Sequence, residues 1–302
     1  MRFAVELPTM RVDEPDQFLS PPAVAEMSRA ADAAGFDALY VTDHPAGDTT
    51  WLDTGGHHAL DPWVSLSFAA AATERIKLLT YVYIAAYRNP FLSAKAALSL
   101  HVLSGERLIL GMAAGYLRPE FGALGVDFDE RNELLEEAID VMQRSWSGDD
   151  VAVEGRHFRA RGVRMRPVPA TAPPIWMGGN STRALRRAVE VCDGWAPFRS
   201  AGFARASKTA EIDGLDDLLP RIELARRHAE EIGRSRPLDI CYSADRAFGR
   251  GEPADELIDE LGRYSEAGIT WVTVGFPGHE RAVWLDHVHR YAAEVMQRSR
   301  AL

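Results

Sequence analysis

The sequence predicts an α/β protein of the (β/α)8 TIM barrel class, with insertions in some of its loops. Three observations support this prediction: short apolar runs alternate with longer amphipathic segments, eight such runs occur, and no linker divides the chain. The length of 302 residues suits one barrel, because α/β barrels routinely occupy roughly 200 to 250 residues or more as a single unit. We therefore expect residues 1–302 to form one barrel domain.

In chain order, each predicted strand is followed by a helix, as a barrel of this class requires. The strands are expected at Arg2 to Leu7, Ala38 to Thr42, Ile76 to Ile84, Arg107 to Met112, Pro174 to Met177, Gly194 to Phe198, Leu238 to Tyr242 and Thr270 to Val274. The helices are expected at Pro22 to Ala34, Asp61 to Ala72, Pro90 to Leu103, Glu130 to Trp146, Ser181 to Val191, Leu215 to Ile232, Ala254 to Ala267 and His279 to Arg298.

Glycines mark two of the predicted helix ends. Gly35 and Gly268 each follow a helical pattern and precede a strand, which is typical of a left-handed C-cap. Two stretches interrupt the alternation. Asp149 to Pro173 follows a helix and is either an excursion or an edge hairpin around Val151 to Arg159, whereas Arg199 to Gly214 follows a strand and is the better candidate for a lid.

Composition excludes several classes of partner. Lys and Arg total 34 against 44 for Asp and Glu, so the net charge of −10 disfavours nucleic acid and anionic membranes. The N-terminus does not resemble a signal peptide, and no stretch reaches the roughly 20 apolar residues of a membrane span. We expect a cytoplasmic protein, in which Cys192 and Cys241 are buried thiols rather than a disulfide.

Common cofactor and metal motifs are absent from the sequence. The first strand runs into Leu7-Pro8-Thr9-Met10 without a G-x-G-x-x-G turn, and no P-loop occurs. No metal is expected: His57 and His58 are adjacent in a loop, and His287 and His289 point to different faces of a helix.

Strand two ends in Asp43 and His44, at the edge where barrels hold their active sites. Histidine exchanges protons near neutral pH, and Asp43 is expected to orient the imidazole. The alternative is structural: Asp43 caps the next segment, and His44 packs beside Pro45.

Two further strand ends suit a flat ligand with a phosphate. Small residues run from Gly111 to Gly115 and end at Tyr116, so a ring could approach the backbone closely. Strand five ends in Gly178, Gly179, Asn180 and Ser181 at the start of a helix, where backbone N–H groups and the helix dipole favour an anion. A tight turn without a ligand is the alternative. Together these ends indicate a cofactor shaped like a flavin.

Several blocks of the sequence resemble the bacterial luciferase-like superfamily, and within it the F420-dependent oxidoreductases. The blocks are Ile76-Lys77-Leu78-Leu79-Thr80-Tyr81-Val82, Tyr87-Arg88-Asn89-Pro90, Leu103 to Gly111, Pro174 to Ser181 and Asp193-Gly194-Trp195, within a similarity that runs from Met1 to about Ala293. This resemblance implies a barrel, usually dimeric, that binds the deazaflavin F420 or FMN.

The resemblance also implies roles for particular residues. Gly178, Gly179, Asn180 and Ser181 would hold the cofactor phosphate. A non-prolyl cis peptide pressing on the ring would fall at Tyr81-Val82, and Gly115 and Tyr116 would lie near the ring. Asp43 and His44 match a motif that lies near the reacting carbon of F420.

The sequence departs from the sugar-phosphate and alcohol dehydrogenase branches at three points. Tyr116 stands where those relatives have a glutamate, and Glu120 is expected to make only a loop contact. In those relatives a tryptophan comes soon after the histidine. This sequence has no tryptophan at that spacing from His44, because Trp51 comes several residues later. No clear set of lysines and arginines in the later loops would hold a sugar phosphate, so we do not expect that substrate.

We therefore expect hydride transfer between F420 and a small organic substrate, with His44 as proton donor or charge stabiliser and Tyr116 as a second candidate donor. Trp51 and Trp195 either wall the pocket or belong to the core. The rivals are an FMN-dependent monooxygenase that uses oxygen, a metal-dependent barrel hydrolase and a flavin-binding relative without turnover. Because F420 is polyanionic, we expect the acidic residues to lie away from the mouth of the barrel.

Overall fold

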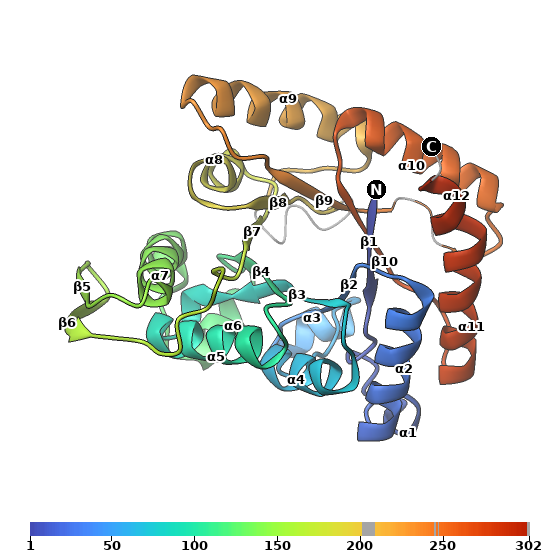
Figure 1. Ribbon diagram of the computed structural model, residues 1–302, viewed down its shortest axis with the longest axis horizontal. Helices are drawn as coiled ribbons and strands as arrows, with labels where there is room; N and C mark the ends of the chain where they lie inside the picture. The colour runs from blue at the N-terminus through green and yellow to red at the C-terminus, as the bar shows by residue number, and fades with distance from the viewer. Residues whose placement is uncertain (201–208, 245, 247, 301–302) are drawn as a thin grey trace.

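Eight parallel strands close into a barrel in the computed structural model, which describes residues 1–200, 209–244, 246 and 248–300 (Figure 1). Their order around the barrel is β1-β10-β9-β8-β7-β4-β3-β2. The barrel strands are β1 (Arg2–Glu6), β2 (Ala38–Val41), β3 (Lys77–Ile84), β4 (Leu108–Ala113), β7 (Ile175–Gly178), β8 (Gly194–Ala196), β9 (Asp239–Ser243) and β10 (Trp271–Val274). The predicted (β/α)8 TIM barrel is confirmed.

Helices surround this barrel (Figure 1). The longer ones are α2 (Pro21–Ala34), α4 (Pro62–Ala72), α5 (Pro90–Leu103), α7 (Arg131–Trp146), α8 (Thr182–Val191), α9 (Leu215–Glu231), α10 (Ala254–Ala267) and α11 (Arg281–Tyr291). Shorter helical segments are α1 (Pro15–Phe18), α3 (Thr49–Asp53), η1 (Ala85–Tyr87), α6 (Arg118–Ala123), η2 (Phe128–Glu130), η3 (Ala292–Met296) and α12 (Gln297–Ser299). Among the described residues, no helix combines the length and apolar character that crossing a membrane requires.

The loop insertion after α7 forms a hairpin, one of the two alternatives that the sequence left open. Strands β5 (Val151–Glu154) and β6 (Arg159–Val163) pair antiparallel and lie outside the barrel. In Figure 1 this hairpin projects beside α7, at the end of the molecule away from α11.

Capping residues set the helix boundaries as the sequence suggests. Gly35 and Gly268 have φ values of 91° and 93°, which confirms the two predicted left-handed C-caps. At N-termini, Asp61 and Asn89 accept backbone hydrogen bonds from the first turns of α4 and α5, and a proline follows each of them.

Two predicted elements differ from the observed ones by more than one residue at an end. Strand β8 ends at Ala196, whereas we predicted Phe198, because Pro197 has no N–H to donate to the ladder. The last predicted helix is divided into α11, a π-helical turn at 292–296 and α12. Loops after β1, β2 and β4 also contain the short helices α1, α3 and α6, which were not predicted.

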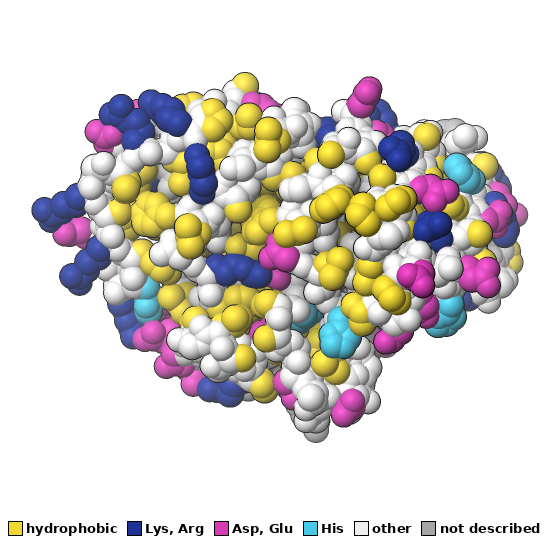
Figure 2. All heavy atoms as spheres, turned by 90° about the horizontal axis from the view of Figure 1, so that it is seen from below, with side chains coloured by type: hydrophobic (Ala, Val, Ile, Leu, Met, Phe, Trp, Pro, Cys, Tyr) yellow, Lys and Arg dark blue, Asp and Glu magenta, His cyan; other side chains and the backbone are white. Residues whose placement is uncertain are grey.

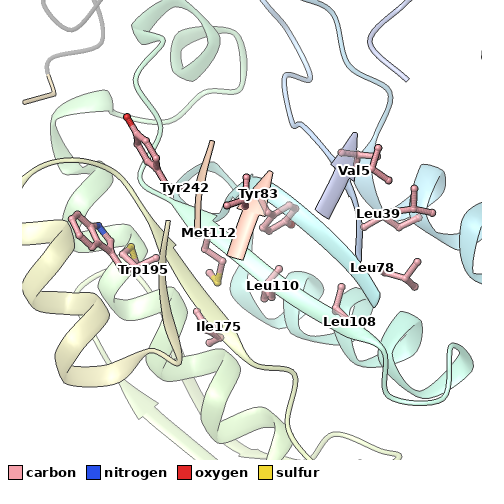
Figure 3. Packing of buried hydrophobic residues seen from close by; sticks show 14 of the residues in the cluster. Val5, Leu39, Leu78, Tyr83, Leu108, Leu110, Met112, Ile175, Trp195 and Tyr242 are labelled. Atoms are coloured by element: carbon pink, nitrogen blue, oxygen red, sulfur yellow. The ribbon is translucent and has the colours of Figure 1, made fainter. Parts of the chain in front are cut away.

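Side chains of the barrel strands alternate between two cores. One set, including Val5, Leu39, Leu78 and Leu110, packs against the surrounding helices (Figure 3). The residues between them form the inner cluster Ala4, Ala38, Leu79, Ile109, Trp176, Ala196, Cys241 and Trp271. Two positions further along three adjacent strands, the inner face presents Glu6, Tyr40 and Tyr81, which form the floor of a cavity.

Candidate active site

A cavity of about 540 Å³ lies at the carboxyl ends of the strands, where barrels of this class hold their active sites. Its walls come from β1, β2, β3, β4, β7 and β8 and from the first turns of α7 and α8. The residues predicted from the sequence that line it are Asp43, His44, Tyr81, Val82, Gly115, Tyr116, Gly178, Gly179 and Ser181.

His44 lies among aromatic rings on one side of this cavity. Its ring centroid is 4.4 Å from that of Trp51 and 4.9 Å from that of His57. The Nε2 atom is 3.5 Å from the hydroxyl of Tyr116, so the two predicted proton donors face each other. Trp51 belongs to α3, which Asp48 caps, and this short helix places its indole against the imidazole.

Glu120, not Asp43, lies behind the imidazole of His44. The Oε2 atom of Glu120 is 3.5 Å from Nδ1 of His44, and the residue is 2% exposed. The other carboxylate oxygen accepts a hydrogen bond of 3.1 Å from the N–H of Ala46. The expected loop contact is present, but Glu120 on α6 also lies beside the imidazole, which the sequence did not indicate.

The predicted orienting role of Asp43 is also wrong, because a different partner holds its carboxylate. Arg88 donates two hydrogen bonds to it, of 2.6 and 2.8 Å, and the N–H of Ile84 donates a third. The guanidinium of Arg88 also lies over the ring of Tyr83, 4.3 Å from its centroid. Asp43 therefore joins the ends of β2 and β3 beneath the site, and this buried ion pair is neutral overall.

Tyr116 and His57 remain uncharged near neutral pH. Burial raises the pKa of Tyr116 to about 12, and the charge of Glu120 adds to this shift. Burial and the neighbouring imidazole of His44 lower the pKa of His57 to about 4. Within the described part of the chain, no cluster of three or more His, Cys, Asp or Glu residues is arranged to hold a metal.

The end of β3 has the cis peptide expected from the resemblance. The bond between Tyr81 and Val82 is cis, and the pairing of β3 with β4 shifts register between Thr80 and Tyr83. Val82 faces the cavity and closely approaches Gly178, where a Cβ would lie 3.0 Å from a Val82 methyl. A larger residue at position 178 would therefore crowd this wall.

The turn between β7 and α8 combines a left-handed glycine with a helix N-terminus. Gly179 has φ of 122°, and the Oγ of Ser181 accepts a hydrogen bond of 3.1 Å from the N–H of Ala184. Gly178, Gly179 and Ser181 line the cavity. The start of α8 thus presents backbone donors and a positive dipole end toward this space.

Asn180 was predicted to hold the cofactor phosphate, but it does not line the cavity. Its side chain instead binds the loop that follows β8. The amide Nδ2 donates to the carbonyls of Phe198 and Ala210, at 2.8 and 3.0 Å, and Oδ1 accepts from the N–H of Phe198. The residue is fully buried. Its side chain therefore supports the turn from behind.

Trp195 belongs to the core rather than to the pocket wall. Its indole is fully buried on the helix side of the barrel (Figure 3), and Nε1 donates a hydrogen bond of 2.9 Å to the carbonyl of Gly179. This contact supports the turn. Of the predicted lid, residues 201–208 lie outside the described residues, and Thr209 lines the cavity.

Three arginines beside this turn were missed by the sequence analysis. Arg131 from α7 and Arg183 and Arg187 from α8 line the same cavity. Arg187 is 6% exposed and pairs with Glu136, which also accepts a hydrogen bond of 3.0 Å from Arg183. Helix periodicity places positions 183 and 187 on one face, so the i, i+4 spacing was the available signal.

Known proteins resemble this chain in sequence and in fold. The sequence profile of the luciferase-like monooxygenase family matches residues 1–291. An F420-dependent glucose-6-phosphate dehydrogenase from Beutenbergia cavernae is 29% identical, over 90% of this chain and 91% of its own length.

Two solved structures are similar in fold over nearly their full lengths. A monooxygenase from Streptomyces bottropensis has a TM-score of 0.78 at 20% identity, with 99% of each chain covered. The coenzyme F420 dependent tetrahydromethanopterin reductase from Methanopyrus kandleri has a TM-score of 0.74 at 18% identity, covering 98% of this chain and 99% of its own.

Proposed function

This chain belongs to the luciferase-like monooxygenase family, and from that premise we propose that it is an F420-dependent oxidoreductase acting on a small organic substrate. The observation that carries the proposal is one cavity with the Gly178 to Ser181 turn and three arginines on one wall and His44 and Tyr116 on another. Glu120 lies behind His44, outside the lining of the cavity. The similarity to an F420-dependent dehydrogenase at 29% identity supports the choice of cofactor.

The residues present fit a cofactor with a strongly anionic tail. The backbone of Gly179 to Ser181 would hold its phosphate, and Arg131 and Arg183 would balance further negative charge. The Nε atom of Arg187 is buried without a hydrogen-bond partner, so a donor is available beside the turn. These groups replace the neutral backbone site that the sequence alone suggested.

The other wall fits a flat ring and a proton exchange. Val82, Ala113 and Gly115 provide an apolar surface without long side chains, against which a ring can lie. F420, when bound, supplies or accepts a hydride. The imidazole of His44 would give or take the accompanying proton of the substrate through Nε2, since Glu120 lies on the side of Nδ1.

Titration with F420 and with FMN, followed by absorbance and fluorescence, tests this proposal. We expect F420 to bind and its affinity to fall as salt rises, because the site uses charge. The rival of the same family is an FMN-dependent monooxygenase. Tight binding of FMN with no binding of F420 would refute our cofactor assignment.

We also propose that the chain forms a homodimer through α4 and α5. These helices are adjacent, and their outer faces expose Val64, Phe68, Leu92 and Leu103, of which Leu92 and Leu103 are 73% and 86% exposed. Figure 2 shows hydrophobic side chains spread across the middle of this side of the molecule, with charged groups mostly toward its edges. Exposed apolar patches of this kind commonly mark protein interfaces.

Single-domain organisation and a cytoplasmic location complete the proposal. Strands from Arg2 to Val274 close one barrel, which supports treating residues 1–302 as one domain. Cys192 and Cys241 are both buried free thiols, which supports a reducing compartment.

A further inference from the structure

We infer that Glu6, together with Tyr40, recognises the substrate at the β1 side of the cavity and selects an uncharged molecule that carries a hydroxyl or carbonyl oxygen. This inference deepens the proposed function and rests on it, because it treats the cavity as a substrate site. Neither residue belongs to the His44 cluster or to the anion-binding turn described above.

The position of Glu6 in the barrel separates it from the anion site. Strand β1 is four places from β7 in either direction around the closed barrel, so Glu6 lies across the mouth from Gly178 to Ser181. Glu6 and Tyr40 are paired neighbours on β1 and β2 and both line the cavity. A ligand anchored at the turn therefore leaves the space beside Glu6 furthest from its anchor.

The carboxyl group of Glu6 lies beside Gly275, which follows the neighbouring strand β10, and Glu6 also lines the cavity. A Cβ placed on Gly275 would lie 3.1 Å from Oε2 of Glu6 and 3.9 Å from the hydroxyl of Tyr40, so the two oxygens converge where Gly275 has no side chain. Among the described residues, no side-chain hydrogen bond or ion pair reaches the Glu6 carboxyl. Because Glu6 lines the cavity, its carboxyl group is available to a ligand or to water.

Charge divides the cavity into two ends. Arg131, Arg183 and Arg187 line the end beside the turn, whereas Glu6 lies with the phenols of Tyr40 and Tyr81 at the other end. The positive charge of Arg11 partly offsets the charge of Glu6. Its guanidinium donates a hydrogen bond of 3.2 Å to the carbonyl of Phe276. A carboxylate or phosphate on the substrate would therefore be repelled beside Glu6, whereas a neutral oxygen would not.

The protonation of Glu6 suits either kind of neutral oxygen. Burial raises the pKa of Glu6 to about 7, and Arg11 only partly opposes this shift. Near neutral pH the group is thus divided between a carboxylic acid, which donates to a carbonyl, and a carboxylate, which accepts from a hydroxyl.

The test uses an isosteric pair of probes, neutral isobutyramide and anionic isobutyrate, with the full chain at pH 7.5, with and without F420. Nuclear magnetic resonance follows the Glu6 carboxyl carbon, assigned by its absence from Glu6→Gln, and saturation transfer gives the relative affinities. The control is Glu231→Gln, which removes one acidic charge from an exposed position on α9.

We expect the wild type to prefer the amide by about tenfold, which corresponds to roughly 1.4 kcal/mol of like-charge repulsion. Glu6→Gln should remove most of this preference, and Glu231→Gln should keep it. Equal binding of both probes by the wild type, an unchanged preference in Glu6→Gln, or no response of the Glu6 signal to isobutyramide would overturn the inference. Failure of F420 to bind would count only against the proposed cofactor, because probe selection is measured without it as well.

Discussion

At the scale of single residues, the chemistry of the site depends on which groups contact His44. Asp43, its neighbour in sequence, accepts hydrogen bonds from Arg88. The contacts of His44 come instead from Trp51, Tyr116 and Glu120. A carboxylate lies beside Nδ1, and Nε2 faces the hydroxyl of Tyr116, so both nitrogens have groups with which a proton can be exchanged.

Replacing His44 tests the role of this imidazole. In His44→Ala we expect hydride transfer to slow by roughly 10²- to 10⁴-fold, the usual contribution of a positioned proton donor, while F420 affinity changes little. Stopped-flow absorbance of F420 and equilibrium titration measure the two quantities. The exposed neighbour variant His58→Ala serves as control, and a transfer rate in His44→Ala equal to that of the wild type would disprove the role.

Glu6 predicts a pH dependence of stability. Its pKa is about 7 in the folded chain and near the ordinary 4.5 when unfolded, so between these values the folded state holds one more proton. The free energy of unfolding of the wild type should therefore fall relative to that of Glu6→Gln as pH rises from 4.5 to about 7, and the difference should be constant above.

Urea unfolding at a series of pH values measures this difference. Glu231→Gln, on the exposed face of α9, should show no comparable change in the same pH window. Parallel curves for the wild type and Glu6→Gln would contradict the raised pKa.

At the scale of elements, the turn from β7 to α8 is supported from behind by its neighbours. Trp195 on β8 donates to Gly179, Asn180 holds the segment after β8, and Arg221 on α9 donates to the carbonyl of Asn180 at 2.8 Å. Because these contacts fix the main chain, the backbone donors at the start of α8 are already oriented for an anion.

Arg183 on α8 tests the charge of the anion site. We expect Arg183→Ala to weaken F420 binding by about tenfold at low salt, or roughly 1.4 kcal/mol, with a smaller effect at high salt because ions screen exposed charges. Fluorescence titration at two salt concentrations measures this. Arg186→Ala is the matched control. Arg186 lies on the same helix but does not line the cavity, since it borders a groove between α7 and α8. An equal loss in both variants would indicate a general effect of charge.

At the scale of the whole molecule, the outer face of α4 and α5 is the surface of the proposed homodimer. Both helices are apolar on more than their core-facing sides, with exposed Phe68 on α4 and Leu92 on α5. A second copy of the chain on this face would remove these side chains from water without covering the mouth of the barrel.

Charged substitutions on this face should produce monomers. We expect the double variant Phe68→Glu with Leu92→Glu to sediment as a monomer and the wild type to sediment as a dimer at micromolar concentrations, because burying two carboxylates opposes association. Ile232→Glu, at an exposed apolar position beyond α9, should leave the dimer intact. A monomeric wild type in sedimentation velocity would refute the proposed interface.

The sequence predicted the elements well because their signals are local. Apolar runs, Asp61 and Asn89 before prolines, and Gly35 and Gly268 at helix ends all act within a few residues. Predictions of roles were less accurate. Arg88 rather than His44 contacts Asp43, and Glu120 lies beside His44, because a side chain's partner depends on which strands and loops the barrel brings together.

The sequence by itself determined the class of fold, the strand ends that form the cavity and the turn at Gly178 to Ser181, since hydrophobic period and turn residues are encoded along the chain. Only the tertiary structure decided which side chains share that cavity. Closure of the barrel places Glu6 across from the anion-binding turn and Glu120 behind His44, although these residues lie far apart in the sequence. Such contacts arise from packing between elements, which no local pattern records.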